Sequence, residues 1–437
     1  MKRLACLSLV AASAAHADAP APAAGAQKLT FERAIAIALE GSADIELAKE
    51  VVAGADAKAA GAKANRWVSL HLNANLNRWR EPYALDFGGA SFTLHEAVTS
   101  TMVVSLSQPL TGLAYLQELV GAAEHDADAT RRDYDRVRLE TAYKTADAYI
   151  RVLEARATAE VAHQSVADIQ SELDRANQLR QADTYTDIDV LRFKSAKAAA
   201  DQIALRADTS VQTALAGLVV TMGLGDGAAV DLADDLPVQP PTLKMALPQV
   251  LQRAIDTRPE LRAAHSKIES AEAARTAAHY KYYPDIRAVA AWQRFTGVQP
   301  FQPENEEYIG LTAQWNVWDW GATHQGVLDA EHAKERATIT ANQLAEQVKL
   351  DVRRRWLEAK TQFDSLAVAQ TQLETAEEAY RLQKVKLDNA AATTTDVLDA
   401  ETEVARARLG FATARYDYYL DLVALARAVG DLPTPKQ

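Results

Sequence analysis

Cysteine, aromatic residues and positive charge are all scarce in this chain. Cys6 is the one cysteine, and because we expect it to be removed with an N-terminal signal, neither a disulfide nor a thiolate zinc site is predicted. Aromatic residues make up 7% of the 437 residues, so a large core would have to be built from Ala, Leu and Val. The formal net charge is −12, which argues against nucleic acid as a partner because phosphate binding requires basic patches.

The first 17 residues have the pattern of a cleaved signal peptide. A short basic region is followed by an apolar stretch and by the small-x-small cleavage pattern Ala15-His16-Ala17. After this segment, no stretch approaches the roughly 18–20 uninterrupted apolar residues of a membrane-spanning helix. If this protein crosses a membrane, we expect it to do so with strands.

The motifs of the common enzyme classes are missing from the sequence. It has no phosphate-binding glycine loop, no His-Glu-x-x-His pair and no Gly-x-Ser-x-Gly elbow. His324 and His332 are eight residues apart on one predicted helix, too far for the usual i, i+4 metal pair. We therefore predict that the chain is not an enzyme and has no cofactor.

The sequence contains two copies of one plan. Residues 29–45 align with 245–261 at a shift of 216, and Asp189-Val190-Leu191 aligns with Asp396-Val397-Leu398 at a shift of 207. The first copy is therefore nine residues longer, and the surplus falls between two predicted strands. We divide the chain into a signal peptide (1–17), a first repeat (18–223), a linker rich in Gly and Pro (224–245), a second repeat (246–430) and a C-terminal tail (431–437).

Each copy is predicted to contain, in order, a helix, two strands, a very long helix and a further helix. Heptad spacing of apolar residues, as at Ala359, Leu366 and Leu373, predicts helices packed as coiled coils. A 70-residue helix is about 105 Å long, and the two shorter helices placed end to end match that length. The predicted helices are 31–64, 113–182, 187–222, 247–280, 321–389 and 394–429.

Between the first and second helices of each copy, apolar and polar residues alternate. Val68, Leu70 and Leu72 alternate with Ser69 and His71, for example, which indicates strands with one apolar and one polar face. A pair of hairpins on a soluble core would show the same alternation. However, the four strands are about ten residues long, as a tilted strand that crosses a bilayer must be. Aromatic residues cluster at their ends, as in an interfacial girdle: Trp67, Trp79, Tyr282, Tyr283, Trp315, Trp318 and Trp320.

Four strands cannot close a barrel alone, and open edges are not tolerated in hydrocarbon. The chain must therefore contribute its strands to a shared barrel, and three chains would supply twelve. We expect the loops at about 79–97 and 294–307 to face the cell exterior.

With this order of elements, the sequence resembles the TolC family of outer-membrane efflux and secretion channels over residues 28–430. The resemblance implies a mainly α protein with transmembrane β structure: a homotrimer with a twelve-stranded barrel and a long coiled-coil periplasmic tunnel. It further implies a passive exit duct in outer-membrane lipid that works with a periplasmic adaptor and an inner-membrane pump or secretion ATPase. The local matches are Thr395-Asp396-Val397-Leu398-Asp399-Ala400, Ala426-Arg427-Ala428-Val429-Gly430, Tyr283-Pro284-Asp285-Ile286 and Pro109-Leu110.

The resemblance also implies candidate gate residues at the periplasmic tip. The two carboxylates that form rings at the constriction of TolC map onto Asp396 and Asp399, where they would attract cations and select for charge. Asp396 is equally suited to start a helix, and we hold Asp189, its equivalent in the first copy, mainly to that capping role and as a weaker gate candidate. The latch residues of TolC correspond to Leu387 and Ala392, whose side chains cannot hydrogen-bond. We therefore predict a differently latched, looser closed state.

A second class of protein shares part of this pattern. A periplasmic coiled-coil adaptor or scaffold that forms no pore would also have long paired helices and a secretory signal. The two amphipathic hairpins argue against it, because such adaptors normally have one hairpin and small β-domains. The exported substrate is left open between drugs, metals and proteins.

Overall fold

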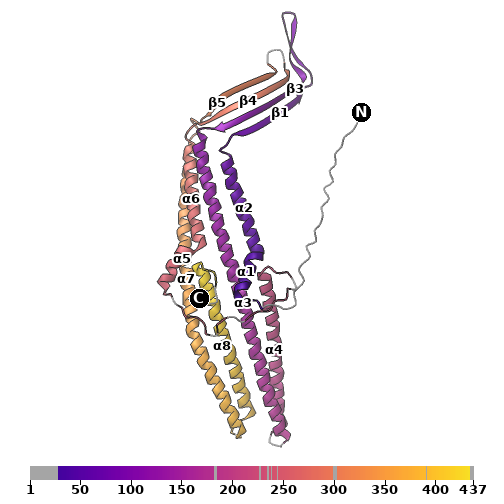
Figure 1. Cartoon of the computed structure of the whole chain (residues 1–437), viewed down its shortest axis with the longest axis vertical. Helices are drawn as coiled ribbons and strands as arrows, with labels where there is room; N and C mark the ends of the chain where they lie inside the picture. Colours follow the sequence, from indigo (N-terminus) through magenta and orange to yellow (C-terminus); the bar gives the residue numbers. More distant parts are fainter. Residues whose placement is uncertain are drawn as a thin grey trace, which may run out of the picture.

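The computed structural model describes most of the chain. The predicted signal peptide with Cys6 and the last four residues of the predicted tail lie outside the described residues. The described ranges are 28–181, 185–225, 228–233, 236–237, 239–243, 245–298, 303–389 and 391–433. Within them, a β-sheet stands at one end of an elongated body of helices (Figure 1).

The described residues form eight helices and five strands. The helices are α1 (Phe31–Gly41), α2 (Ala43–Ala64), α3 (Gly112–Gln181), α4 (Asp187–Thr221), α5 (Leu247–Thr257), α6 (Pro259–Tyr280), α7 (Ala322–Asp388) and α8 (Thr394–Val429). The strands are β1 (Ser69–Arg78), β2 (Tyr83–Phe87), β3 (Ala90–Pro109), β4 (Asp285–Val298) and β5 (Asn305–Gln314).

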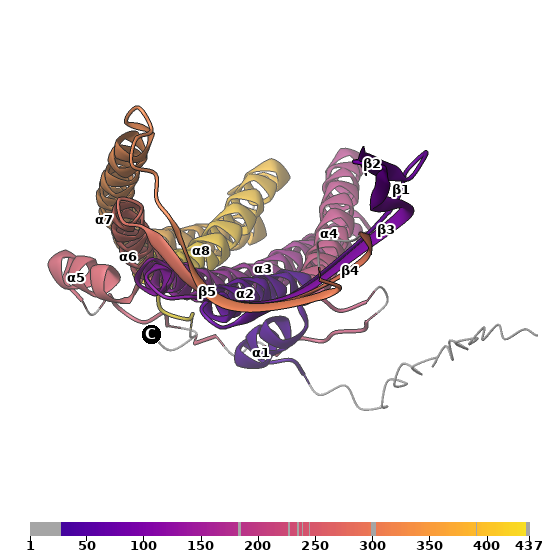
Figure 2. The same ribbon diagram turned by 90° about the horizontal axis from the view of Figure 1, so that it is seen from above.

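The two predicted first helices, 31–64 and 247–280, are each broken once. At Ser42 the backbone is extended, and the Ser42 hydroxyl caps α2 by accepting a hydrogen bond from the Ile45 N–H at 3.4 Å. At the equivalent point of the second repeat, Pro259 begins α6 and the preceding Arg258 is extended, because proline disfavours a helical residue before it. The short pieces α1 and α5 lie on the convex side of the row of long helices (Figure 2).

The short helices of each repeat stack end to end beside a long one. In the first repeat α2 and α4 both pack against α3, and in the second α6 and α8 both pack against α7. Contacts of α3 with α6 and α8 join the repeats. The result is one curved row of helices, seen end-on in Figure 2. Of the predicted heptad positions, Ala359 is fully buried, and Leu366 and Leu373 are half-buried.

In each repeat, the last helix ends against the break between the first two helices, and we call this contact the stacking joint. A glycine lies at each of the two stacking joints. Gly223 follows α4 at φ +72°, and a Cβ there would lie 2.5 Å from the Gly41 carbonyl oxygen. Gly430 follows α8 at φ +94°, and a Cβ there would lie 3.2 Å from Arg258 backbone atoms. Both the left-handed backbone and the close approach require the absence of a side chain. The shift of 207 relates the two glycines, so the same joint occurs in both repeats.

The sheet is antiparallel with the order β1-β3-β4-β5. Ser69 pairs with Ser107 in the first repeat and Asp285 pairs with Gln314 in the second. The shifts of 216 and 207 convert one pair into the other, so both hairpins have the same register. The predicted loop at 79–97 is wrong in part, because it contains β2 and the first half of β3, which pair with each other. The surplus residues of the first repeat build this extra hairpin.

Exchange of Gly430 for alanine tests the joints. We expect Gly430→Ala to lower the stability of the fold by about 1–2 kcal/mol from the left-handed backbone alone, since Arg258 also restricts the space. Gly410→Ala on α8 is the matched control: a Cβ there meets nothing within 4 Å, and we expect alanine to stabilise the helix by up to about 1 kcal/mol. Thermal unfolding of the purified protein, followed by circular dichroism, measures both. Equal melting temperatures for the two variants would contradict this account of the joint.

Candidate functional site

The three candidate carboxylates lie at the helical end farthest from the sheet. Asp189 is in the first turn of α4, and Asp396 and Asp399 are in the first two turns of α8. The α3–α4 and α7–α8 connections form the two tips at the bottom of Figure 1. All three residues thus belong to the same end of the molecule.

Asp396 takes part in a capping box. Its carboxylate accepts hydrogen bonds from the Thr393 N–H and hydroxyl, both at 2.7 Å, and its own N–H donates to the Thr393 hydroxyl at 3.2 Å. The Thr393 N–H and then the hydroxyl hold the pKa of Asp396 below its usual range. The side chain is exposed, so a fixed negative charge faces solvent at the tip.

Asp189 forms the same box and also reaches the other tip. One carboxylate oxygen accepts from the Thr186 N–H at 3.0 Å and hydroxyl at 2.7 Å, and the other accepts from the Thr394 hydroxyl at 2.9 Å. Next to it, the Arg192 guanidinium donates to the Thr395 hydroxyl at 2.9 Å. The first repeat's tip is therefore hydrogen-bonded to the second repeat's tip.

Asp399 belongs to a polar stripe that follows one face of α8. The stripe consists of residues spaced three, four or eleven apart: Asp399, Glu403, Arg406, Asp417 and Asp421. Tyr419 lies on the opposite face of α8, where its hydroxyl donates to the Pro237 carbonyl at 2.5 Å. Pro237 belongs to the inter-repeat linker, whose residues Leu232 and Leu236 pack with Phe31 of α1, the helix on the convex side (Figure 2). The polar stripe therefore faces the concave side of the row.

At the end of the stripe away from the tips, carboxylates lie close to one another. Burial, and then the neighbouring charges of Glu358 and Asp417, raise the pKa of Asp421 to about 6. Burial also raises the pKa of Asp417 and, with the charge of Asp417, that of Glu154 on α3. Sequence analysis missed this cluster because its members come from α3, α7 and α8, which only the fold brings together.

Ion pairs between α3 and the α7–α8 hairpin form a seam close to the tips. The Lys384 ammonium lies 2.6 Å from the carboxylate of Glu172, which is only 4% exposed, and Arg175 is paired with Asp388. A buried carboxylate is stable only with such a partner. The seam therefore ties the second repeat's hairpin to the first repeat.

The seam continues away from the tips. Arg408 donates to Asp168 at 2.9 Å and to Glu377 at 3.1 Å, and the Ser165 hydroxyl donates to Glu401 at 2.6 Å. Burial raises the pKa of Glu401. The sequence holds a signal for this residue, since Glu401 stands between Val397 and Val404 at the interior spacing of α8, a position normally occupied by an apolar side chain.

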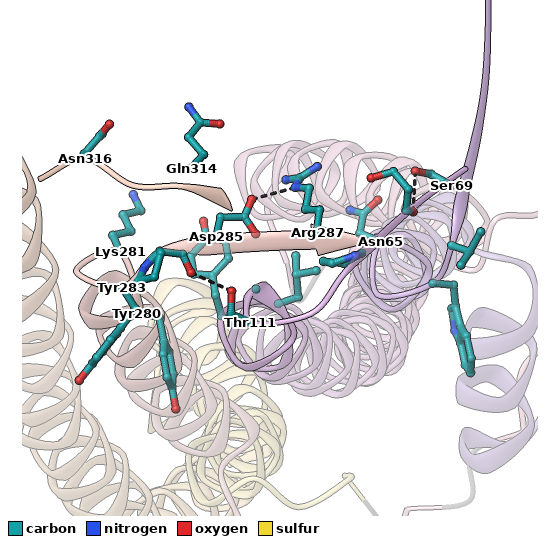
Figure 3. A pocket seen from close by; sticks show the side chains of 18 of the residues that line it. Asn65, Ser69, Thr111, Tyr280, Lys281, Tyr283, Asp285, Arg287, Gln314 and Asn316 are labelled. Atoms are coloured by element: carbon teal, nitrogen blue, oxygen red, sulfur yellow. Dashed lines mark hydrogen bonds and ion pairs between the residues drawn. The ribbon is translucent and has the colours of Figure 1, made fainter. Parts of the chain in front are cut away.

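At the other end, a cavity of about 740 Å³ lies where the sheet meets the helices. Figure 3 shows Asn65, Asp285, Arg287 and Gln314 among the polar side chains that line it. Asp285 and Arg287 form an ion pair at 2.8 Å. Among the described residues, no group of three or more His, Cys, Asp or Glu side chains is arranged to hold a metal ion.

Comparison with known proteins agrees with this architecture. The structure of CusC matches with a TM-score of 0.80 at 16% identity, over 93% of both chains. The Campylobacter jejuni channel CmeC matches with a TM-score of 0.77 at 15% identity, over 92% of this chain and 85% of its own. Vibrio cholerae VceC matches with a TM-score of 0.76 at 19% identity, over 92% of this chain and 96% of its own. No curated protein matches the sequence significantly.

The family comparison covers both repeats. The model of the outer membrane efflux protein family matches residues 34–224 and 250–431, which is most of the chain. The long helices and the sheet with an apolar face are the parts that such a channel requires. The chain therefore belongs to the outer membrane efflux protein family, and it is an outer-membrane transport channel with a large periplasmic helical part rather than an enzyme.

Proposed function

We propose that three copies of this chain form a passive exit duct of a tripartite efflux pump or a type I secretion system. The observation that supports this most directly is the pair of open sheet edges. In the described residues, β1 pairs only with β3 and β5 pairs only with β4, while apolar side chains of both edge strands are exposed, with Ile309 at 89%. In lipid, unpaired edges must be paired by another copy.

The helices carry exposed apolar residues at both lateral ends of the row. On α7, at one end, exposed apolar residues are spaced seven, eleven or fourteen apart: Ile339, Leu350, Leu357, Val368 and Leu382. On α4, at the other end, they are Ile188, Leu191, Ile203, Leu205 and Val220. Two different faces that meet head to tail close a ring. Three copies of the curved row would thus enclose a tunnel below a twelve-stranded barrel.

The exposed apolar surface of α4 could also be interpreted as that of a membrane-spanning helix. α4 is the one helix among the described residues that is long and apolar enough to cross a membrane by length and composition, and 17% of its apolar window is buried within the protomer. However, α4 lies beside α3 in the helical half, away from the sheet (Figure 1). We assign its exposed apolar surface to contact with the next copy, not with lipid.

At the tips we propose a gate lined by carboxylates. Asp396 and Asp399 from each of three copies would form rings of like charge at the narrow end, attracting cations and selecting for charge. Asp189 is the weaker candidate, because its carboxylate is engaged with Thr186 and Thr394.

The latch of the closed state would differ from that of TolC. Leu387 is buried and Ala392 has no polar side-chain atom, so the residues at the TolC latch positions cannot serve. The cross-hairpin ion pairs Arg175–Asp388 and Lys384–Glu172 are the groups we propose instead. These ion pairs connect the two helical hairpins of one protomer and do not connect neighbouring protomers. The tips of neighbouring protomers would therefore be less tightly held together in the closed state.

The periplasmic adaptor and the inner-membrane pump or secretion ATPase are proposed as partners from the family alone. A pore-free adaptor or scaffold is less well supported, because it would leave the open edges of a sheet with exposed apolar side chains unexplained. Planar-bilayer recording decides between them: we expect the purified protein to form cation-preferring pores. A detergent-free, water-soluble monomer that passes no ions would contradict the duct.

Acidification tests the carboxylates of the polar stripe. Because the pKa of Asp421 is raised to about 6, its negative charge is present at pH 7 and is lost as the pH falls through that value. Cation preference, measured from reversal potentials in a salt gradient, should therefore decline between pH 7 and 5. Asp421→Asn should lower the preference at pH 7 and reduce the pH dependence. The matched control is Asp256→Asn on the outer helix α5, and an identical pH profile in both variants would contradict the assignment.

Removal of a cross-hairpin ion pair tests the latch. We expect Arg175→Ala to raise single-channel conductance severalfold, since Asp388 loses the partner that ties its hairpin to α3. Arg180→Ala is the control, because Arg180 pairs with Asp187 at 2.6 Å within the α3–α4 hairpin and should leave conductance unchanged. Wild-type conductance as small as that of a firmly shut pore would disprove a looser closed state.

A further inference from the structure

The turn between β5 and α7 presents two tryptophans, Trp318 and Trp320, and the backbone of Trp320 is strained. Trp320 has φ +56° and is the one described non-glycine residue with a positive φ; Gly321 follows at +85°. Glycine would adopt this conformation without the steric conflict of a Cβ. Trp320 is nevertheless 90% exposed, and its ring lies edge-on to that of Trp318 at 5.6 Å. Within the protomer, the strained backbone of Trp320 is therefore not compensated by burial of its indole.

Hydrogen bonds to Asp319 fix the backbone of the turn at the start of α7. The Asp319 carboxylate accepts hydrogen bonds from the Gly321 N–H at 3.1 Å and from the Thr323 N–H at 2.9 Å and hydroxyl at 2.5 Å. In the first repeat, the chain passes from β3 to α3 through Leu110 and Thr111 alone. The fold therefore does not require the tryptophan turn. The difference is that β3 is an internal strand whereas β5 is an edge strand.

The internal repeat predicts what the β5 edge meets. β3 joins β4, the first strand of the next repeat, with Ser107 opposite Val289 and Pro109 opposite Arg287. We assume that β5 joins the partner subunit's β1 in the same way. Adding 207 to the β3 residue and subtracting 216 from the β4 residue then gives the pairs between copies. Gln314 then faces the partner subunit's Asn73, and Asn316 faces the partner subunit's His71. The turn from Trp318 to Trp320 follows these paired residues directly, so it would lie beside the segment that leads into the partner subunit's β1, with the partner subunit's Trp67.

The equivalent joint within the chain shows which position Trp318 would occupy. There the Thr111 hydroxyl donates to the Pro284 carbonyl at 2.7 Å and accepts from the Ile286 N–H at 2.8 Å (Figure 3). The shifts place Trp318 in the position of Thr111 and the partner subunit's Val68 in that of Pro284. Trp67 and Val68, which immediately precede β1, are 76% and 54% exposed. The contact between repeats within one chain is thus hydrogen-bonded, whereas the equivalent contact between two copies would be apolar.

We propose that the turn from Trp318 to Trp320 clasps the start of the partner subunit's β1 at the partner subunit's Trp67 and Val68. This inference rests on the proposed shared barrel and adds the residues and register of its joint. Aromatic side chains supply large contact areas with defined geometry. Burial in this contact explains why tryptophan is kept at a strained position.

Paired cysteines test the clasp directly. Cys6 is the one cysteine of the sequence, so a variant without it gives a clean background. Trp67→Cys combined with Trp320→Cys should yield covalent dimers and trimers on denaturing gels after treatment with a short bismaleimide in intact membranes. Either substitution alone, or Trp67→Cys with Trp356→Cys on the helical part of α7, should yield none. Pore conductance of the same preparations tests the shared barrel separately: conducting pores without crosslinks would overturn the clasp alone.

Trp320→Gly provides a second test that does not depend on crosslinking geometry. Because glycine relieves the backbone strain, we expect the protomer to fold as before, with unchanged circular dichroism. We also expect the trimer to dissociate in detergent at a lower temperature than wild type. A trimer that is as heat-resistant as wild type, or more so, would overturn the proposal.

Discussion

The backbone groups along the free edges of β1 and β5 dominate the design of this protein. In hydrocarbon an unpaired N–H or C=O costs several kcal/mol, and each chain brings too few strands to pair its own edges. The edges therefore determine the assembly, and the assembly determines the helices. In the proposed ring, the two lateral ends of the row meet when the sheet edges meet, which would account for the exposed apolar residues of α4 and α7.

Because the chain is internally duplicated, the same contacts occur in both repeats. The two hairpins have one register, the two stacking joints use Gly223 and Gly430 at equivalent positions, and the two tips have equivalent capping boxes. A joint that works between the repeats can then be repeated between copies. The repeats diverge where the environments differ: β2 extends the first hairpin, and the Trp318–Trp320 turn stands only at the edge strand.

Much of the fold could be predicted from the sequence because its signals are local. Periods of two and of three to four distinguish strand from helix, and the capping residues Thr186 and Thr393 mark where α4 and α8 begin. The helix breaks at Ser42 and Arg258 also have local signals, the capping hydroxyl of Ser42 and the proline that follows Arg258. The sequence analysis nevertheless predicted one continuous helix at each place. β2 was missed because its short, exposed sequence does not alternate clearly. The cluster around Asp421 and the pair Lys384–Glu172 could not be predicted, because they depend on which helices become neighbours.

Hydrogen exchange of the edge strands tests the central claim most directly. In the trimer reconstituted into lipid, the shared barrel predicts that amides of β1 and β5 exchange as slowly as those of the internal strands β3 and β4. Fast exchange along β1 and β5, with slow exchange confined to β3 and β4, would show that the edges stay open and would contradict the account.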